Sequence, residues 1–307
     1  MTTCRFYSVV AVAALVVLPA CAVRSMPPAT AAAAAPLFAN AVADVARMER
    51  DTNEARFEAL TAMLAERRIA FTIEPFTIEP NKREPRTQGR NIVVTIPGRT
   101  PEIVVGAHYD AARLADGTLS KGAVDNAASA MVLVRLADTL SNARPRNQVR
   151  IVFFDMEELG LFGSAEFVRI HRDRPVRLMV NLDVNAFGDT TIFGSRIGSN
   201  AAALHALRLV CATTASACVE FPRMPPSDDI SFSGAAIPAV SIATMPQLHA
   251  HQLWMQFNGG RNAGLAAGFV AEILRSIHTP ADTSALVTPQ AMAQAYRVAL
   301  GLIRAFE

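Results

Sequence analysis

Two adjacent glutamates, Glu157 and Glu158, follow a continuous apolar run in the stretch VRIVFFDMEELGLFGS, residues 149–164. An apolar run of this length predicts a strand that is covered on both faces of an α/β sheet. Open α/β sheets bind their ligands in the crevice beyond the carboxyl ends of the strands. Taken alone, the pair is also compatible with a solvated turn, so its meaning depends on what else reaches the same edge.

Further polar clusters fall at expected strand ends and helix ends. His108 and Asp110 end a strand in GAHYD, and a carboxylate at that spacing can hold the far nitrogen of a metal-bound histidine. Asp125 opens a helix in GAVDNAASA, where a helix N-cap is the ordinary role of an aspartate. Asp183 ends another strand, and His278 follows a long helix in HTPADT.

Together these clusters could place two histidines and several carboxylates at one edge of the sheet. Such a set suits zinc, which accepts imidazole nitrogen and carboxylate oxygen, and the absence of cysteine argues against a closed structural site. Five ligands with one spare carboxylate is the right number for two ions that share a bridging carboxylate and a water. Each fragment also has an ordinary interpretation as a cap, a turn or a core histidine.

Expected strands and helices alternate along the part of the chain that carries these residues. This alternation predicts a three-layer α/β/α fold with a central, mostly parallel mixed sheet. A helix broken near residues 51–53 is expected over 37–69, and the direct repeat FTIEP-FTIEP, residues 71–80, predicts an edge strand because proline cannot donate to a sheet ladder. Strands are expected at 92–96, 103–107, 149–154, 178–182, 191–193 and 239–242, and helices at 124–140, 161–171, 201–212, 263–277 and 289–306.

The composition is that of a globular protein. The 307 residues are 51% hydrophobic and 18% charged, with a formal net charge of +2. Lys and Arg are scattered and form no basic patch, so nucleic acid is not an expected partner.

The N-terminal residues 1–21 predict a secretory signal, because Arg5 precedes an apolar run that is too short to span a bilayer. The residues before and including Cys21, LPAC, resemble a bacterial lipobox with Cys21 as the acylated residue. Simple cleavage nearby is the alternative, because Pro19 is uncommon at its place in that motif. The Ala/Pro-rich residues 22–36 predict a tether, and 37–307 a single catalytic domain. We therefore expect an exported protein, either lipid-anchored and facing the periplasm or secreted.

Cys211 and Cys218 are the two cysteines outside the leader. An even pair that closes a short loop in an exported chain suggests a disulfide bond. Two buried free thiols are the alternative.

Six fragments, GAHYD, GAVDNAASA, DMEELGLFGS, NLD, SDD..F and HTPADT, occur in this order across roughly residues 90–290. They resemble the co-catalytic di-zinc exopeptidases of metallopeptidase family twenty-eight, among which bacterial leucyl aminopeptidases are familiar. Six ordered motifs are far more specific than any one of them. The resemblance implies a fold of the zinc-dependent exopeptidase type, two zinc ions per chain, and removal of N-terminal residues from peptide substrates.

Carried over residue by residue, the resemblance also implies roles at the site. Glu157 would be the general base that takes a proton from the bridging water, and Asp110 would orient His108. The zinc pair would polarise the scissile carbonyl and lower the pKa of the water. The implied ligands are His108 and Asp183 for one zinc, Glu158 and His278 for the other, and Asp125 as the bridge, with a cis peptide compatible at Asp125-Asn126.

The chain departs from the family pattern at two places. Asp229 and Ser231 stand where members often have His and Pro, which puts one wall of the substrate pocket in doubt. An inserted segment, about residues 245–275, contains Trp254 and a Gly-Gly turn expected to precede a helix. It could be a lid over the pocket or a surface insertion. The remaining histidines, His171, His205, His249 and His251, are expected to have no part in metal binding.

Other activities compete with the aminopeptidase. A glutaminyl cyclase resembles this family but works with one zinc and makes pyroglutamate. A carboxypeptidase of the same fold would shorten the other end of a peptide. A peptide-binding module with an inactive site is disfavoured, because every metal position is filled.

Overall fold

The computed structural model describes residues 35–80, 86–195, 200–214, 216–260 and 263–307. The expected leader with Cys21, and all but the last two residues of the expected tether, lie outside the described residues. Within the described ranges, no helix combines the length and the apolar character that a membrane crossing needs.

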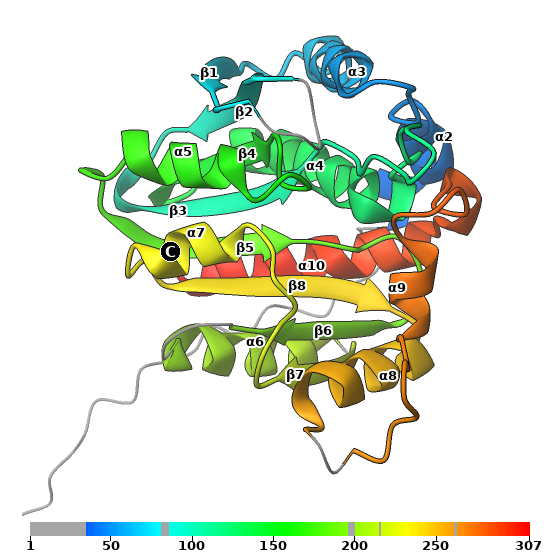
Figure 1. Cartoon of the computed structure of the whole chain (residues 1–307). Helices are drawn as coiled ribbons and strands as arrows, with labels where there is room; N and C mark the ends of the chain where they lie inside the picture. The colour runs from blue at the N-terminus through cyan, green and yellow to red at the C-terminus, as the bar shows by residue number, and fades with distance from the viewer. Residues whose placement is uncertain (1–34, 81–85, 196–199, 215, 261–262) are drawn as a thin grey trace, which may run out of the picture.

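An eight-stranded sheet runs through the molecule in the order β1-β2-β4-β3-β5-β8-β6-β7 (Figure 1). Its central strands β4, β3, β5 and β8 are mutually parallel, whereas β1 with β2, β2 with β4, and β6 with β8 are antiparallel. The strands are β1 (Thr72–Thr77), β2 (Gln88–Ile96), β3 (Arg99–His108), β4 (Asn147–Phe154), β5 (Val176–Leu182), β6 (Thr190–Gly194), β7 (Ala217–Phe221) and β8 (Ala239–Met245).

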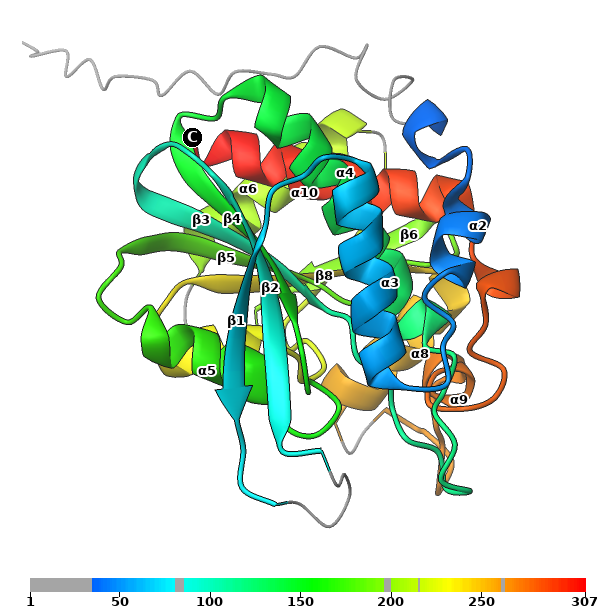
Figure 2. The same ribbon diagram turned by 90° about the horizontal axis from the view of Figure 1, so that it is seen from above.

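Helices cover both faces of this sheet, as Figure 2 shows. Apolar side chains of α4, α6 and α10 join the larger core cluster on one face, and Phe167 of α5 and Phe232 of α7 join the smaller one on the other. The three-layer α/β/α prediction is therefore confirmed. The helices are η1 (Ala35–Phe38), α2 (Ala41–Ala46), α3 (Asn53–Glu66), η2 (Ala123–Ala127), α4 (Ala128–Ala143), α5 (Phe162–Ile170), α6 (Ala201–Thr214), α7 (Asp229–Gly234), α8 (Gln247–Asn258), α9 (Glu272–Ser276), η3 (Ser284–Leu286) and α10 (Pro289–Ala305).

Most expected elements are present. The break in the N-terminal helix lies between α2 and α3, where Thr52 caps α3 by accepting a hydrogen bond from the backbone of Ala55. All six expected strands occur with somewhat longer bounds. The short strand β7 and the short helix α7 were not predicted, because neither is long enough to show a clear hydrophobic period.

The helix expected at 263–277 is wrong. In the inserted segment a helix, α8, precedes the Gly-Gly pair, and only the short α9 falls inside the expected range. Gly264 and Gly268 have φ values of +68° and +75°. These left-handed conformations cannot continue a right-handed helix, so the apolar residues around them gave a misleading helical pattern.

The edge strand β1 forms where the FTIEP repeat predicted one. It pairs with β2 alone, and it combines residues of both copies of the repeat. Phe76 is buried directly over Gly89, where a Cβ atom would lie only 2.2 Å from the phenyl ring. Ile73, on the other face of the strand, is 46% exposed.

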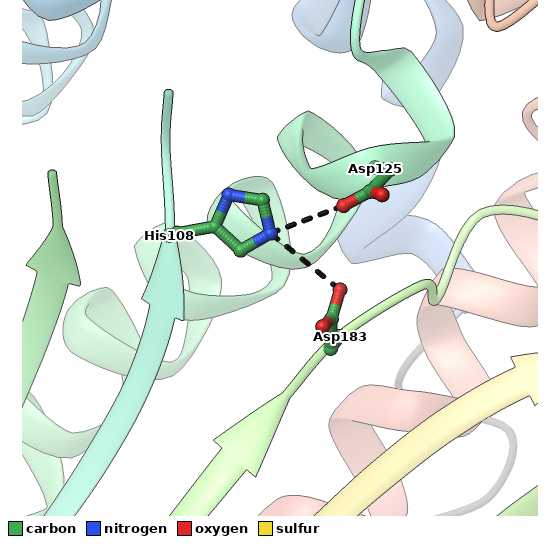
Figure 3. A group of neighbouring side chains, drawn as sticks. All are labelled: His108, Asp125 and Asp183. Carbon is green, nitrogen blue, oxygen red and sulfur yellow. Dashed lines mark ion pairs between the residues drawn. The ribbon is translucent and has the colours of Figure 1, made fainter. Parts of the chain in front are cut away.

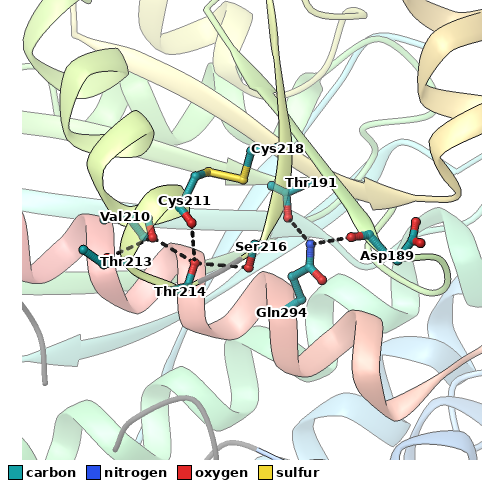
Figure 4. The surroundings of a disulfide bond; sticks show 9 residues. All are labelled: Asp189, Thr191, Val210, Cys211, Thr213, Thr214, Ser216, Cys218 and Gln294. Carbon is teal, nitrogen blue, oxygen red and sulfur yellow. Dashed lines mark hydrogen bonds between the residues drawn. A yellow bond between two sulfur atoms is a disulfide. The ribbon is translucent and has the colours of Figure 1, made fainter. Parts of the chain in front are cut away.

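The predicted disulfide is present between Cys211 in α6 and Cys218 in β7 (Figure 4). It joins the last turns of a helix to the outermost strand beside it. Close by, Gln294 of α10 donates hydrogen bonds to the carbonyl of Asp189 and the hydroxyl of Thr191, which connects this edge of the sheet to the C-terminal helix.

Candidate metal centre

The parallel strands β3, β4 and β5 bring three of the predicted clusters to one edge of the sheet. His108 is the last residue of β3, and Asp183 directly follows β5. Glu157 and Glu158 lie in the turn that follows β4. The carboxyl ends of adjacent parallel strands meet at the same edge, so these residues converge because of the topology.

Two further residues come to this edge from loops. Asp125 lies in the short helical turn η2 in front of α4, where its backbone leaves the helical conformation at φ −119°. The Asp125-Asn126 peptide is cis, as the family resemblance allowed. His278 lies between α9 and η3 with φ +56°, a conformation that non-glycine residues seldom adopt.

His108, Asp125 and Asp183 form a first group (Figure 3). The Nε2 atom of His108 is 3.0 Å from Oδ1 of Asp125 and 3.6 Å from Oδ1 of Asp183. The imidazole is 1% exposed, so the group lies at the buried end of the site.

Asp125, Glu158 and His278 form a second group. The Nε2 atom of His278 is 3.0 Å from Oδ2 of Asp125 and 3.0 Å from Oε2 of Glu158. The two carboxylate oxygens of Asp125 therefore face different histidines, which is the arrangement of a bridging ligand.

The chemistry of these groups fits metal ions. Nε2 of His108, Oε1 of Glu158 and Oδ1 of Asp183 are buried, yet none makes a hydrogen bond of acceptable geometry with the described residues. Buried polar atoms normally have partners, and a bound cation would satisfy these ligand atoms. The nitrogen–oxygen separations of 3.0–3.6 Å within the two groups suit ligands of one cation with bonds of about 2.0–2.2 Å.

Asp110 ties two of the converging strands together. Its Oδ1 is 3.4 Å from Nδ1 of His108, on the far side of the imidazole from the candidate ion. The same carboxylate accepts hydrogen bonds from the backbone N–H groups of Glu157 at 3.1 Å and Glu158 at 3.2 Å. Asp110 thus orients both the imidazole of His108 and the turn that carries the two glutamates.

Two positioning residues were missed in the sequence, although both lie inside the quoted motifs. The buried carboxylate of Asp282, in HTPADT, accepts hydrogen bonds from the backbone N–H groups of Val124 and Asp125. The side chain of Asn126 donates to the carbonyl of Leu182 and accepts from the N–H of Val184. Asn126 therefore fixes the backbone on both sides of Asp183.

Burial and mutual repulsion shift the proton affinities of the site. Burial raises the pKa of Glu157 well above its usual range, and the charge of His108 opposes this shift. Burial and the charge of Asp125 raise the pKa of Glu158 to about 7. Hydrogen bonds to Asp125 and Glu158 raise the pKa of His278 to about 11. In the metal-free protein, these shifts favour the protonated forms of Glu157 and His278 at neutral pH.

A cavity of about 200 Å³ adjoins the carboxylates. The inserted segment supplies much of its apolar wall, and Figure 1 shows α8 and α9 side by side at this end of the molecule. The segment therefore contributes to the lining of the cavity. The residues that line the cavity are Asp125, Glu157, Glu158, Asp183, Val184, Ile192, Met224, Pro225, Pro226, Ser227, Ser241, Ile242, Ala243, Met245, Leu253, Phe257, Ile273, Leu274, Ile277 and His278.

Asp229 and Ser231, the two substitutions relative to the family pattern, are not among the residues that line the cavity. Asp229 is fully buried and is not among the lining residues, whereas Ser227 is. Ser231 forms a hydroxyl–hydroxyl hydrogen bond of 2.8 Å with Ser164. Neither Asp229 nor Ser231 therefore forms part of the cavity surface.

The other four histidines belong to none of the candidate metal groups of the described residues. Nε2 of His171 is 2.9 Å from Oε1 of Glu74, and His205 is exposed. Within the described part of the chain, each candidate metal group contains His108 or His278, so neither His249 nor His251 belongs to one.

Comparisons with known proteins agree with this geometry. The model of Peptidase family M28 matches residues 91–303. The chain is similar to the uncharacterized protein YfbL of Escherichia coli, with 35% identity over 109 residues, 33% of this chain and 34% of that protein. It is also similar to a probable leucine aminopeptidase of Arthroderma otae, with 32% identity over 116 residues, 34% and 31% of the two chains. These matches span about a third of each relative.

Solved structures share the fold at low identity. The LapA aminopeptidase of Legionella pneumophila superposes with a TM-score of 0.63 at 16% identity, over 91% of this chain and 73% of its own. The glutaminyl cyclase of Tannerella forsythia superposes with a TM-score of 0.66 at 18% identity, over 88% and 98% respectively. At these identities the likeness establishes the architecture alone.

The proton occupancy of the site leads to a prediction. Binding of zinc to the metal-free protein is expected to release protons, because His278 and Glu158 must lose them to become ligands. Since protons compete with the metal, the affinity should rise from pH 6 to pH 8, by about tenfold per pH unit for each proton released. Titration calorimetry in two buffers with different ionisation enthalpies measures the number released. An affinity that does not change over this range would contradict the assignment.

Proposed function

The chain belongs to peptidase family M28, and on that premise we propose that it is a zinc aminopeptidase, a hydrolase that removes N-terminal residues from peptides. The observation that carries the proposal is the pair of ligand groups that share Asp125. Imidazole and carboxylate ligands suit zinc. The proposed occupancy is two zinc ions per chain, one with His108 and Asp183 and one with Glu158 and His278. Bound there, the ions would supply Lewis acidity toward the scissile carbonyl and water.

Glu157 is the proposed general base. Its side chain is 13% exposed, lines the cavity and lies 4.0 Å from Nε2 of His108. Asp110 holds its backbone N–H, which directs the side chain relative to the neighbouring ligands. A carboxylate with a raised pKa can take a proton from the attacking water and pass it to the leaving amine.

The cavity is the proposed subsite for the side chain of the N-terminal residue. It begins at the carboxylates and is lined mainly by apolar side chains, among them Ile242, Leu253 and Phe257. Its volume of about 200 Å³ can accept a leucine, methionine or phenylalanine side chain. The lining contains no Lys or Arg that would attract an acidic side chain. The preferred substrates are therefore peptides with a large apolar first residue.

Export is part of the proposal. The Cys211–Cys218 disulfide supports an oxidising compartment such as the periplasm or the outside of the cell. The leader 1–21 would direct the chain there, and acylation of Cys21 would attach it to the membrane surface, with simple cleavage as the alternative.

A glutaminyl cyclase is the second candidate. The observation in its favour is coverage, because the cyclase fold aligns over 98% of its own length and the LapA fold over 73%. The placement of Asp183 beside His108 favours the peptidase, because a second ligand group has no use in an enzyme with one zinc. A carboxypeptidase of the same fold would differ in which end of the peptide it shortens.

Product analysis by mass spectrometry tests these alternatives. The zinc-loaded fragment that starts at Pro36 is expected to shorten a mixed peptide library one N-terminal residue at a time, fastest after large apolar residues, and a chelator is expected to stop the reaction. Loss of ammonia from peptides with N-terminal glutamine would indicate a cyclase instead. Trimming from the other end would indicate a carboxypeptidase.

Replacement of the base separates chemistry from metal binding. The Glu157→Gln variant is expected to lose at least about 100-fold in kcat, because general-base catalysis typically contributes 10²–10⁴-fold, while it keeps its zinc content. Metal analysis of the same samples provides the control. Turnover close to that of the unaltered enzyme would exclude Glu157 as the base.

The apolar wall is tested by the Phe257→Ala variant. Removing this ring should lower kcat/KM for leucine-initiated peptides by about 10-fold, because less apolar surface is buried on binding, and alanine-initiated peptides should be affected less. Leu248→Ala is the matched control, because Leu248 lies on the same helix but is 64% exposed and does not line the cavity. An equal effect of both variants on both substrates would place the subsite elsewhere.

A further inference from the structure

Arg56, near the start of α3, is completely buried beside the candidate metal centre. Its guanidinium donates four hydrogen bonds, all to backbone carbonyls. The acceptors are Met48 at 2.9 Å, Tyr109 at 2.7 Å, Lys121 at 2.7 Å and Gly122 at 3.1 Å. These carbonyls come from three separate segments of the chain, at residues 48, 109 and 121–122.

Two of the three segments carry candidate metal ligands. Tyr109 stands between His108 and Asp110 at the end of β3. Lys121 and Gly122 lead directly into η2, which carries Asp125. One planar group therefore bonds to the strand end that presents the imidazole and to the loop that presents the shared carboxylate. Because the donors of a guanidinium are fixed in one plane, they also fix the separation of their acceptors.

The fit around this group is close. Gly122 adopts φ +56°, and a Cβ atom at this position would lie 3.2 Å from Nη1 of Arg56 and 2.9 Å from the carbonyl oxygen of Asp125. A glycine suits the left-handed backbone here, and a Cβ atom would also lie 2.7 Å from Cβ of Ala111. The loop before Asp125 thus packs closely against both Ala111 and Arg56.

The positive charge of Arg56 also interacts with the carboxylates of the candidate metal centre. Burial of an arginine without a directly paired carboxylate is costly, and none of these four carbonyl acceptors carries a full charge. Burial lowers the pKa of Arg56, while the charges of Asp110, Asp282, Glu158 and Asp125 favour its protonated form. The acidic centre and the buried cation therefore stabilise each other.

We propose that Arg56 is a positioning residue of the metal centre, which sets the His108 strand end and the Asp125 loop at ligand distance before an ion binds. The inference rests on the proposed zinc site. It extends the site to α3, which lies outside residues 91–303 of the family match. A purely structural arginine, which only attaches α3 to the domain, is the competing explanation.

The test compares Arg56→Lys and Arg56→Met with Arg135→Met in the fragment that starts at Pro36. Arg135 is the matched control, because its side chain is only 12% exposed and ties α4 to Asp44 of α2, away from the ligand loops. Two quantities are measured on metal-free protein: zinc affinity, by competition with a chromophoric chelator, and backbone hydrogen exchange. Neither measurement requires peptide hydrolysis.

Zinc affinity should fall by about 10- to 100-fold in both Arg56 variants, as it does when groups that orient ligands are removed from other metal sites. Lysine keeps the charge but has one nitrogen, so it cannot bond to all four carbonyls, and Arg56→Lys should also show faster exchange confined to residues 109–112 and 121–126. Arg135→Met should lower the melting temperature without changing zinc affinity.

Two results would overturn the inference. One is a folded Arg56→Lys variant with the zinc affinity and exchange pattern of the unaltered chain. The other is faster exchange across the whole domain with unchanged affinity, which would mark Arg56 as structural. If the unaltered chain itself binds no zinc, the proposed function fails, and local exchange in Arg56→Lys still decides whether Arg56 orders the two loops.

Discussion

Mutual repulsion of carboxylates at one edge of the sheet is the constraint on which the rest of the structure depends. Like charges in a partly buried site repel strongly, because little water is present to screen them. The fold opposes this repulsion with two histidines, with the guanidinium of Arg56 and with backbone N–H groups directed at Asp110 and Asp282. Divalent cations would complete the compensation, so the same arrangement is costly without ions and favourable with them.

The sequence was sufficient for the architecture and for the groups that ligate. His108, the glutamate pair and Asp183 could be placed because each follows a buried apolar strand, and parallel strands share an edge. The structure brings them together with Asp125 and His278, while their individual roles stay predictions. Arg56 could not be found in this way, because it lies on an ordinary amphipathic helix and its acceptors are carbonyls that only the tertiary fold supplies.

In the inserted segment, the sequence pattern predicted a helix in the wrong place. Its composition suggested a helix after the Gly-Gly pair, yet the helix lies before it, and glycines with positive φ carry the chain back to α9. With α8 ahead of the turn, Leu253 and Phe257 from α8 and Ile273 and Leu274 from α9 all line the cavity, so a single insertion forms much of the apolar wall.

The FTIEP repeat at the sheet edge offers a second phenylalanine that could lie opposite Gly89. If the strand moved forward by five residues, Phe71 and Thr72 would replace Phe76 and Thr77, and residues 67–70 would lie opposite residues 90–93. The two registers differ by about 17 Å along the strand. The shifted register would draw the residues between α3 and β1 into the strand, so the strand could move only if α3 moved with it. The hydrogen bonds that fix α3 in the core therefore select the register of a strand on the other side of that linker.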